Sequence, residues 1–359
     1  HPSGLSSPCI VIETDGRDEW CELPEPLENY AELDPALLRE RVRGAGIVGM
    51  GGAAFPSSVK LNPGPDKPIH TLIINGVECE PFLTTDHRVM LEQSDDIFMG
   101  IRYLLKVTGA KRAIIGVEAN KPDAAAHLRE KFPSDLLGSV ETLQVKYPQG
   151  AEKMLFAALL GREVPSGGLP LDIHALCCNV ATAAEIGRLL PQGRGIQERV
   201  ITVTGPAVKK KGNYRIPIGT PLRFLLEHVG VEEDVNRVFL GGPMMGAAAS
   251  SLDISITKGT SGVTAFTDSA AERTHSKVYP CIRCGYCVDA CPIFLNPSQL
   301  GRLAANEEFD TMAAEHNLMD CFECGSCSFV CPSHIPLVQQ FRAAKAAVRK
   351  AAASKAGAA

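Results

Sequence analysis

The chain reads CIRCGYCVDACP at residues 281–292 and repeats the pattern as CFECGSCSFVCP at residues 321–332. Each copy has three cysteines separated by two residues, then a fourth cysteine that directly precedes a proline. This spacing is typical of paired [4Fe-4S] clusters, in which the first three thiolates bind one cluster and the fourth binds its neighbour. The sequence therefore predicts a helical, ferredoxin-like domain that carries single electrons.

The cysteines of the two copies divide into two predicted ligand sets, because the fourth cysteine of each copy binds the other cluster. The first set is Cys281, Cys284, Cys287 and Cys331, and the second set is Cys321, Cys324, Cys327 and Cys291. Disulfides and structural zinc are the alternatives, although zinc sites usually take two CxxC pairs with a longer gap between them. The other cysteines have no ligand spacing, and we expect them to be small buried hydrophobes: Cys9, Cys21, Cys79, Cys177 and Cys178.

Length and composition bound the remaining possibilities. A chain of 359 residues is long enough for two or three domains, and its net charge of −5 gives no electrostatic reason to expect nucleic acid. Thirteen cysteines without a secretory signal indicate the reducing cytoplasm. No stretch is apolar enough to cross a bilayer, so we expect membrane attachment through partners. We interpret the start at His1 and the alanine and lysine repeat at residues 343–359 as cut ends.

The first half of the chain has the pattern of an α/β domain. A proline-rich segment with one predicted strand, residues 8–12, precedes a short helix that begins at Asp34-Pro35 and ends at Gly44. Residues 71–75 and 113–117 are continuous apolar runs of strand length, with helical spacing between them at residues 97–108. Strands that are apolar on both faces and alternate with helices predict a parallel sheet covered by helices.

The next segment has the alternation of a small β-grasp-like unit. Residues 199–205 and 214–218 read as two strands joined by a turn. Thr220-Pro221 is predicted to cap a helix that ends at Gly230 and places these residues on one face: Leu222, Leu225, Leu226 and Val229. Further on, residues 297–319 are helical in pattern. The alanine- and lysine-rich tail is expected to be a solvated helix or disordered.

A glycine-rich stretch, GAGIVGMGGAAFPSSVK at residues 44–60, suits a phosphate. Glycines let backbone N–H groups approach a phosphate closely, and Lys60 adds a positive charge. The stretch is not the dinucleotide fingerprint, because no strand directly precedes it, and it lacks the Gly-Lys-Ser/Thr context of a P-loop. A mobile glycine turn is the alternative.

Four motifs in this order resemble the flavin-binding, NADH-oxidising subunit of complex I: GMGGAAFP at residues 49–56 with Lys60, NGVECEP at residues 75–81 with Asp86, YPQGAEK at residues 147–153, and NVAT at residues 179–182. The motif GGPMMG at residues 241–246 and the two cysteine runs extend the resemblance. Over nearly the whole chain, the sequence resembles the C subunit of the Rnf ion-translocating ferredoxin:NAD+ oxidoreductase.

The resemblance implies two [4Fe-4S] clusters and bound FMN, with NAD(H) as substrate. The residues that it implies for the FMN loop are Gly49, Gly51, Gly52, Ala53, Phe55 and Lys60. Those implied around the isoalloxazine are Asn75, Glu78, Glu80, Asn179 and Thr182, and those bordering the nicotinamide are Tyr147, Gly150 and Glu152. Glu80 and Glu152 are the predicted catalytic residues. An alternative is that Glu78 and Glu80 only cap the end of the strand at Asn75, and we expect Asp86 and Arg88 to form a structural ion pair.

With the resemblance, the chain divides into five predicted parts. These are a remnant of a truncated N-terminal domain at 1–30, an FMN/NAD(H)-binding α/β domain at 31–197, a soluble-ligand-binding β-grasp (SLBB) module at 198–270, a two-[4Fe-4S] domain at 271–341, and the tail at 342–359. Val77, Ala151 and Cys178 depart from the complex I pattern. The complex I subunit also carries only one cluster in the corresponding region, with a different cysteine spacing. These departures favour the Rnf branch.

We expect a peripheral subunit on the cytoplasmic face of the bacterial inner membrane, in complex with the other subunits of an Rnf-type complex. It would exchange electrons between NAD(H), FMN and the clusters, and a ferredoxin-like protein is a further expected electron partner. One alternative is a soluble flavo-iron–sulfur reductase resembling the cobalamin reductase of bacterial microcompartments. Another is an electron conduit that has lost its flavin, which Val77 and Ala151 would support.

Overall fold

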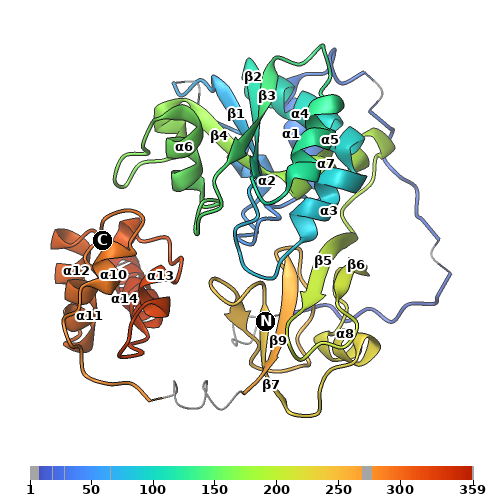
Figure 1. Ribbon diagram of the computed structural model, residues 1–359. Helices are drawn as coiled ribbons and strands as arrows, with labels where there is room; N and C mark the ends of the chain where they lie inside the picture. The colour runs from blue at the N-terminus through green and yellow to red at the C-terminus, as the bar shows by residue number, and fades with distance from the viewer. Residues whose placement is uncertain (1–7, 18, 28, 65, 269–276, 358–359) are drawn as a thin grey trace. The chain divides into compact units, whose positions relative to one another are not determined.

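The computed structural model describes residues 8–17, 19–27, 29–64, 66–268 and 277–357 (Figure 1). The chain forms two compact units. The first comprises His1–Glu163, Pro170–Gly242 and Gly246–Thr267, and the second comprises Val164–Leu169, Pro243–Met245 and Asp268–Ala359. The first unit therefore holds both the α/β domain and the β-grasp module, and the second holds the cysteine runs.

The α/β domain is built on a four-stranded parallel sheet. Its strands are β1 (Thr71–Gly76), β2 (Arg112–Glu118), β3 (Gly138–Leu143) and β4 (Ala175–Asn179), in the order β3-β2-β1-β4. Leu72, Ile73 and Ile74 of β1 are fully buried, because helices cover both faces of the sheet. The prediction of parallel strands that are apolar on both faces is confirmed.

Helices surround this sheet, with α6 on one side and α4, α5 and α7 on the other (Figure 1). The helices of the domain are α1 (Pro35–Gly44), α2 (Ser57–Lys60), α3 (Thr85–Glu92), α4 (Ser94–Thr108), α5 (Pro122–Glu130), α6 (Glu152–Leu160) and α7 (Val180–Leu189), with the 3-10 turns η1 (Pro170–Ile173) and η2 (Leu190–Gln192). The predicted start of α1 is confirmed, since the Asp34 carboxylate accepts a hydrogen bond from the Ala36 N–H.

The β-grasp module consists of a mixed five-stranded sheet and one helix. Its strands are β5 (Glu198–Thr204), β6 (Gly212–Pro217), β7 (Val235–Leu240), β8 (Ala247–Ala248) and β9 (Gly262–Thr267), in the order β6-β5-β9-β7-β8, and its helix is α8 (Leu222–Val229). The four apolar residues predicted on one face of α8 are all buried. The predicted cap is wrong in detail, because the Thr220 hydroxyl donates to the Pro217 carbonyl and Pro221 precedes the helix without a side-chain cap.

Several short helices and one long helix, α14, make up the described part of the second unit around the cysteine runs. They are α10 (Tyr286–Asp289), α11 (Pro297–Ala305), α12 (Phe309–Glu315), η3 (Leu318–Asp320), α13 (Ser326–Phe329) and α14 (Leu337–Gly357). The predicted helical stretch at 297–319 is confirmed, but left-handed residues Glu307 and Asn317 interrupt it. The tail is helical as one prediction had it, yet Ala344 and Lys345 are buried, so its first turns belong to the core of this unit.

Two predictions for the beginning of the chain are wrong. Residues 8–12 form no strand, and Ile10 and Val11 are 88% and 89% exposed, because no described strand pairs with them. Cys9 and Cys21 are exposed rather than buried. Cys177 is buried as predicted, whereas Cys79 and Cys178 are half-buried.

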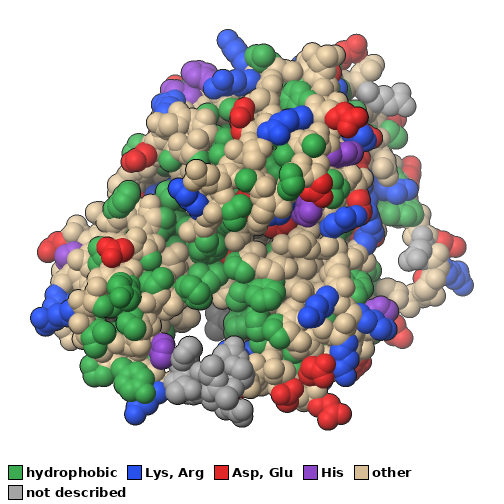
Figure 2. Space-filling view, viewed as in Figure 1, with side chains coloured by type: hydrophobic (Ala, Val, Ile, Leu, Met, Phe, Trp, Pro, Cys, Tyr) green, Lys and Arg blue, Asp and Glu red, His purple; other side chains and the backbone are tan. Residues whose placement is uncertain are grey.

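The surface carries charges of both signs. On the face shown in Figure 2, Lys and Arg side chains are interspersed with Asp and Glu. Hydrophobic side chains are also exposed on the second unit, of which Phe294 and Phe329 are the most accessible at 91% and 78%. Within the described ranges, no helix combines the length and apolar character needed to span a membrane.

Candidate functional site: a crevice at the sheet edge and a thiol cavity

The strand order reverses direction at the carboxyl ends of β1 and β4, the position at which open α/β sheets form a ligand crevice. From β1 the chain builds β2 and β3 on one side and then returns to the other side for β4. In open α/β sheets, such a reversal of direction is where ligands bind. Asn75 and Asn179 are partners in the register of these two strands and lie at this point. The two asparagines predicted to contact a flavin therefore flank the crevice.

The glycine loop at residues 49–55 is closed on itself and fixed to α7. The Gly49 N–H donates to the Phe55 carbonyl at 2.8 Å, and the Met50 N–H donates to the Thr182 hydroxyl at 2.9 Å. Phe55 is 51% exposed. Thr182 of α7 thus holds the backbone of the loop, and the Phe55 side chain stays accessible.

The tip of the loop favours glycine at Gly52, whereas a side chain at Gly51 would make only an ordinary contact. A Cβ on Gly51 would touch the Asn179 side chain at 3.4 Å. Gly52 has a φ of +106°, a backbone conformation that strongly favours glycine, and both Gly52 and Ala53 are exposed. The loop therefore presents uncovered backbone beside the crevice, as a phosphate cradle requires.

Both asparagines use their side chains to hold the backbone of the site. Asn179 caps α7 by accepting from the N–H groups of Ala181 and Thr182, at 3.0 and 3.3 Å, and it donates to the Asp86 carboxylate at 2.7 Å. Asn75 donates to the Gly150 carbonyl at 2.9 Å. The structure thus gives each asparagine a scaffolding role, and their flavin contacts stay predictions.

Glu78 lies at the start of α3. Its carboxyl oxygens accept from the N–H groups of Asp86 and His87 at 2.9 and 3.2 Å, so it caps this helix rather than the end of β1. Burial, with the nearby Asp86 carboxylate, raises the pKa of Glu78 to about 8. Burial also raises the pKa of Asp86 to about 6. The predicted Asp86–Arg88 pair is wrong, because Arg88 pairs with Glu92 on the next turn of the helix.

Glu80, Tyr147 and Gly150 belong to the segments that follow β1 and β3. The Tyr147 hydroxyl donates to the Glu80 carboxylate at 3.4 Å, and a Cβ on Gly242 would lie 2.2 Å from Glu80 Cγ. A Cβ on Gly150 would lie 2.2 Å from the Val77 carbonyl, so only glycine fits there. The structure therefore brings Glu80 and Tyr147 together, as the motif resemblance implied for one site.

Lys60 and Glu152 form an ion pair. Lys60 ends α2 and Glu152 begins α6, and the ammonium lies 3.1 Å from the carboxylate. Burial alone would lower the pKa of Lys60, but the Glu152 carboxylate raises it above its ordinary value. Lys60 is therefore charged at neutral pH. The sequence assigned these residues to different parts of the site, and the structure joins them.

Two basic residues of the β-grasp module were missed by the motif search. Arg199 on β5 is fully buried and donates to the carbonyls of Met50 and Lys258. It lies near Asp86, and burial lowers the pKa of Arg199 to about 10. The Lys258 ammonium donates to the Gly46 carbonyl at 2.7 Å. The module thus holds the segment that leads into the glycine loop. One signal in the sequence indicated Arg199. This residue alternates with Ile201 and Val203 along β5, so it lies on the same face of the strand as these two buried residues.

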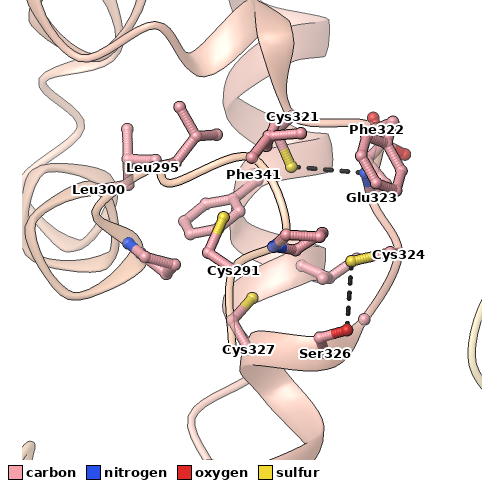
Figure 3. Close-up of a pocket in the computed structure, with 15 residues that line it drawn as sticks. Cys291, Leu295, Leu300, Cys321, Phe322, Glu323, Cys324, Ser326, Cys327 and Phe341 are labelled. Carbon is pink, nitrogen blue, oxygen red and sulfur yellow. Dashed lines mark hydrogen bonds between the residues drawn. The ribbon is translucent and has the colours of Figure 1, made fainter. Parts of the chain in front are cut away.

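In the second unit, the four cysteines of the second predicted ligand set line one cavity (Figure 3). Cys321, Cys324 and Cys327 line it together with Cys291 from the first cysteine run, against apolar residues that include Phe341. Burial, followed by the charges of the other three cysteines, raises the pKa of the Cys327 thiol to about 12. An iron–sulfur core would offset this repulsion with positive charge, so the donor set fits a cluster.

The first predicted set is more exposed. Burial, then the neighbouring Cys331 and Cys284, raises the pKa of Cys287. This places the fourth cysteine of the second run beside the first run. Cys281 and Cys284 are exposed. Among the described side chains, no three His, Cys, Asp or Glu are close enough to hold a single metal ion.

The architecture thus consists of a glycine loop at the reversal point of a parallel sheet, a β-grasp module and a cysteine-rich helical unit. Family models agree with this architecture. Residues 42–188 match the Nuo51 FMN-binding domain, residues 200–248 match the SLBB domain, and residues 280–336 match the 4Fe-4S dicluster domain. These ranges fall inside three of the predicted domains, whose own boundaries stay predictions.

Relatives make the family specific. The chain is 44% identical over 321 residues to the C subunit of the proton-translocating ferredoxin:NAD(+) oxidoreductase complex of Clostridium ljungdahlii, a match that covers 89% of this chain and 70% of that protein. It is 41% identical over 347 residues to the corresponding Na(+)-translocating protein of Acetobacterium woodii, covering 96% and 77%. The chain belongs to the family formed by the C subunits of ion-translocating ferredoxin:NAD(+) oxidoreductase complexes, which confirms the resemblance found in the sequence.

Some family members are much longer. The C subunit of the ion-translocating oxidoreductase complex of Pasteurella multocida is 42% identical over 349 residues, and the match spans 97% of this chain but only 41% of that protein. Among solved structures, an NAD+-reducing [NiFe]-hydrogenase in the H2-reduced state matches with a TM-score of 0.61 and 18% identity, over 88% of this chain and 64% of that one. This likeness confirms the predicted fold.

Proposed function

We propose that this chain is the peripheral electron-transfer subunit of a membrane-bound, ion-translocating oxidoreductase, exchanging electrons between NAD(H) and two [4Fe-4S] clusters through FMN. The observation that carries the proposal is the convergence of four cysteines from both runs on one cavity, in a chain that also has a glycine loop at its sheet crevice. The names of its relatives support the NAD(H) and ferredoxin partners.

The residues at the crevice fit FMN. Bound FMN would supply the exchange between the two electrons of a hydride and the single electrons of clusters. The exposed loop at residues 49–55 would cradle the phosphate, with the charged Lys60 one short helix away. Thr182 and Arg199 would keep the loop in place, since each already binds the backbone of Met50.

Glu80 and Glu152 are the proposed catalytic residues, and their role is positioning. Hydride transfer between NAD(H) and a flavin needs the two rings aligned, and no side chain has to supply a proton for it. Tyr147 orients Glu80 through its hydroxyl, and Lys60 orients Glu152. Gly150, which excludes any side chain beside Val77, would leave room for the nicotinamide.

The eight cysteines of the two runs would bind the clusters in the exchanged scheme. Cys291 lies with the second run and Cys331 beside the first, which supports this assignment. Electrons would pass to the membrane-bound subunits of the complex or to a ferredoxin-like protein. The chain would attach to the bacterial inner membrane through these membrane-bound subunits, on the cytoplasmic face.

The flavin half of the proposal is tested by anaerobic purification and addition of NADH. We expect a flavin absorption band that bleaches with NADH. Lys60→Ala should lower the FMN content about tenfold and leave the iron content unchanged, because it removes a charge beside the phosphate loop. The control is Lys67→Ala, which removes a lysine paired with Asp172 away from the loop and should keep its flavin.

The outcomes separate the alternatives. Wild-type protein without any NADH-dependent bleaching would support a flavin-free conduit. Full flavin content in Lys60→Ala would remove Lys60 from the phosphate site. Co-purification with membrane subunits distinguishes the proposed complex from a soluble reductase.

A further inference from the structure

The two cysteine runs differ in charge at one equivalent position. Arg283 lies between the first two cysteines of the first run, and Glu323 lies there in the second run. Both residues have left-handed backbones, with φ values of 56° and 63°, so the two loops have the same local shape. Between the first two cysteines, only the second run therefore places a carboxylate, while the first run has its carboxylate, Asp289, between the third and fourth cysteines. A carboxylate there opposes the addition of an electron to a cluster.

Two cations from α14 neutralise this carboxylate. The Lys345 ammonium lies 3.0 Å from Glu323 Oε1, and Arg342 Nε lies 2.9 Å from Oε2. The three side chains thus form one ionic cluster of two cations and one carboxylate beside the second run.

Lys345 is the partner closest to the cluster ligands. Its side chain is only 5% exposed, and its ammonium also donates to the backbone carbonyl of Cys321. The Glu323 N–H in turn donates to the Cys321 thiol sulfur at 3.4 Å. A buried charge is poorly screened by water and salt, unlike one on the surface. An electron added to the adjacent cluster would feel Lys345 strongly.

We propose that Lys345 is a positioning residue for the second cluster, formed by Cys321, Cys324, Cys327 and Cys291, that holds the Cys321 loop and raises the reduction potential of this cluster. The proposal rests on the proposed function for the presence of the clusters. It gives a role to the first turns of the alanine- and lysine-rich helix. It also gives the two clusters different surroundings, because the buried Lys345 lies beside the second run, whereas Arg283, at the position of Glu323 in the first run, is exposed.

The test is a redox titration of the full chain, followed by electron paramagnetic resonance of the reduced clusters. Lys345→Met keeps the apolar length of the side chain and removes the charge. It should lower the reduced-to-oxidised ratio of one cluster about tenfold at a fixed potential, a shift of about 59 mV to more negative values. The midpoint potential of the other cluster should not change. Lys345→Arg should restore the wild-type midpoint, and Lys350→Met, an exposed lysine on the same helix, should leave both midpoints unchanged.

A second variant keeps the test informative if Lys345→Met loses iron. Glu323→Gln removes the negative charge beside the same thiols, so it should shift the same cluster to more positive potential. Unchanged midpoints in both variants, or shifts of the same sign, would overturn the role of Lys345. Wild-type protein without two four-iron signals would instead refute the proposed cofactors, so the two failures are distinguishable.

Discussion

Glu78 is the residue at which burial and charge conflict most directly. Its carboxyl group is buried beside Asp86 and caps α3, and its pKa is raised from 4.5 to about 8. Between these pH values the group is protonated in the folded chain and ionised in the unfolded chain. Raising the pH therefore favours unfolding throughout this interval, by up to about 1.4 kcal/mol per pH unit.

Replacing Glu78 should reduce this pH dependence, of which the raised pKa of Asp86 leaves a part. We expect the melting temperature of the wild-type chain to fall between pH 5 and pH 8, and that of Glu78→Gln to fall less, as measured by thermal unfolding at intervals of pH. Glu141→Gln, which changes an exposed glutamate on β3, is the control and should follow the wild type. Parallel curves for wild type and Glu78→Gln would show that Glu78 is ionised in the folded protein.

The sequence predicted the types of residue at the site but not their partners. The glycine loop, Asn75 and Asn179 were found from short motifs, and the structure places all three at one crevice. It could not show that Lys60 pairs with Glu152, because 92 positions separate them and spacing within a motif is informative only locally. Arg199 was missed for the same reason, since its partners lie in another module.

At the scale of elements, α7 is held against α4 by two glycines. A Cβ on Gly187 of α7 would lie 1.9 Å from the Asp96 carbonyl, and a Cβ on Gly100 of α4 would lie 1.8 Å from the Ala183 carbonyl. The two helices therefore meet backbone to backbone. Because Asn179 caps α7 and Thr182 lies in its first turn, this contact also sets the position of the glycine loop.

Adding a methyl group at this contact should disturb both stability and the loop. Gly187→Ala should cost about 1–3 kcal/mol through overpacking, and it should weaken flavin retention because α7 must shift. Denaturant unfolding and FMN content measure the two effects. Gly44→Ala is the matched control, since Gly44 is also helical but has open space around it, and it should be neutral or stabilising. Equal stability of the two variants would contradict the tight contact.

Strands were predicted correctly where an apolar run pairs with another strand of the same domain. The runs at residues 71–75 and 113–117 became β1 and β2, which pair with each other in parallel. The run at residues 8–12 is also apolar, but no strand among the described residues lies beside it, and it is exposed. A strand needs neighbours to satisfy its backbone, so composition alone overpredicts strands at the edge of a domain.

At the scale of the whole molecule, the exchanged ligand scheme links the two cysteine runs. Cys331→Ser should damage mainly the cluster of Cys281, Cys284 and Cys287, and Cys291→Ser should damage mainly the cluster of Cys321, Cys324 and Cys327. Redox titration of each variant shows which midpoint is lost. Loss of the cluster within the mutated run itself would contradict the exchange.

The order of the modules was readable from the sequence because each has its own signature. Parallel-strand pattern, hairpin alternation and cysteine spacing follow one another along the chain, and the three family matches fall in the same order. The four cysteines that line the thiol cavity are those of the second predicted ligand set, and their role as cluster ligands stays a prediction. The buried Lys345 was not predicted, because its place in an alanine-rich helix resembles that of any solvated lysine.

The central claim is that this chain holds two four-iron clusters, and counting iron in anaerobically reconstituted protein tests it most directly. The account predicts about eight irons per chain, as two [4Fe-4S] clusters require, and two paramagnetic centres after full reduction. A protein that retains about four irons or fewer, with a single centre or none, would contradict it.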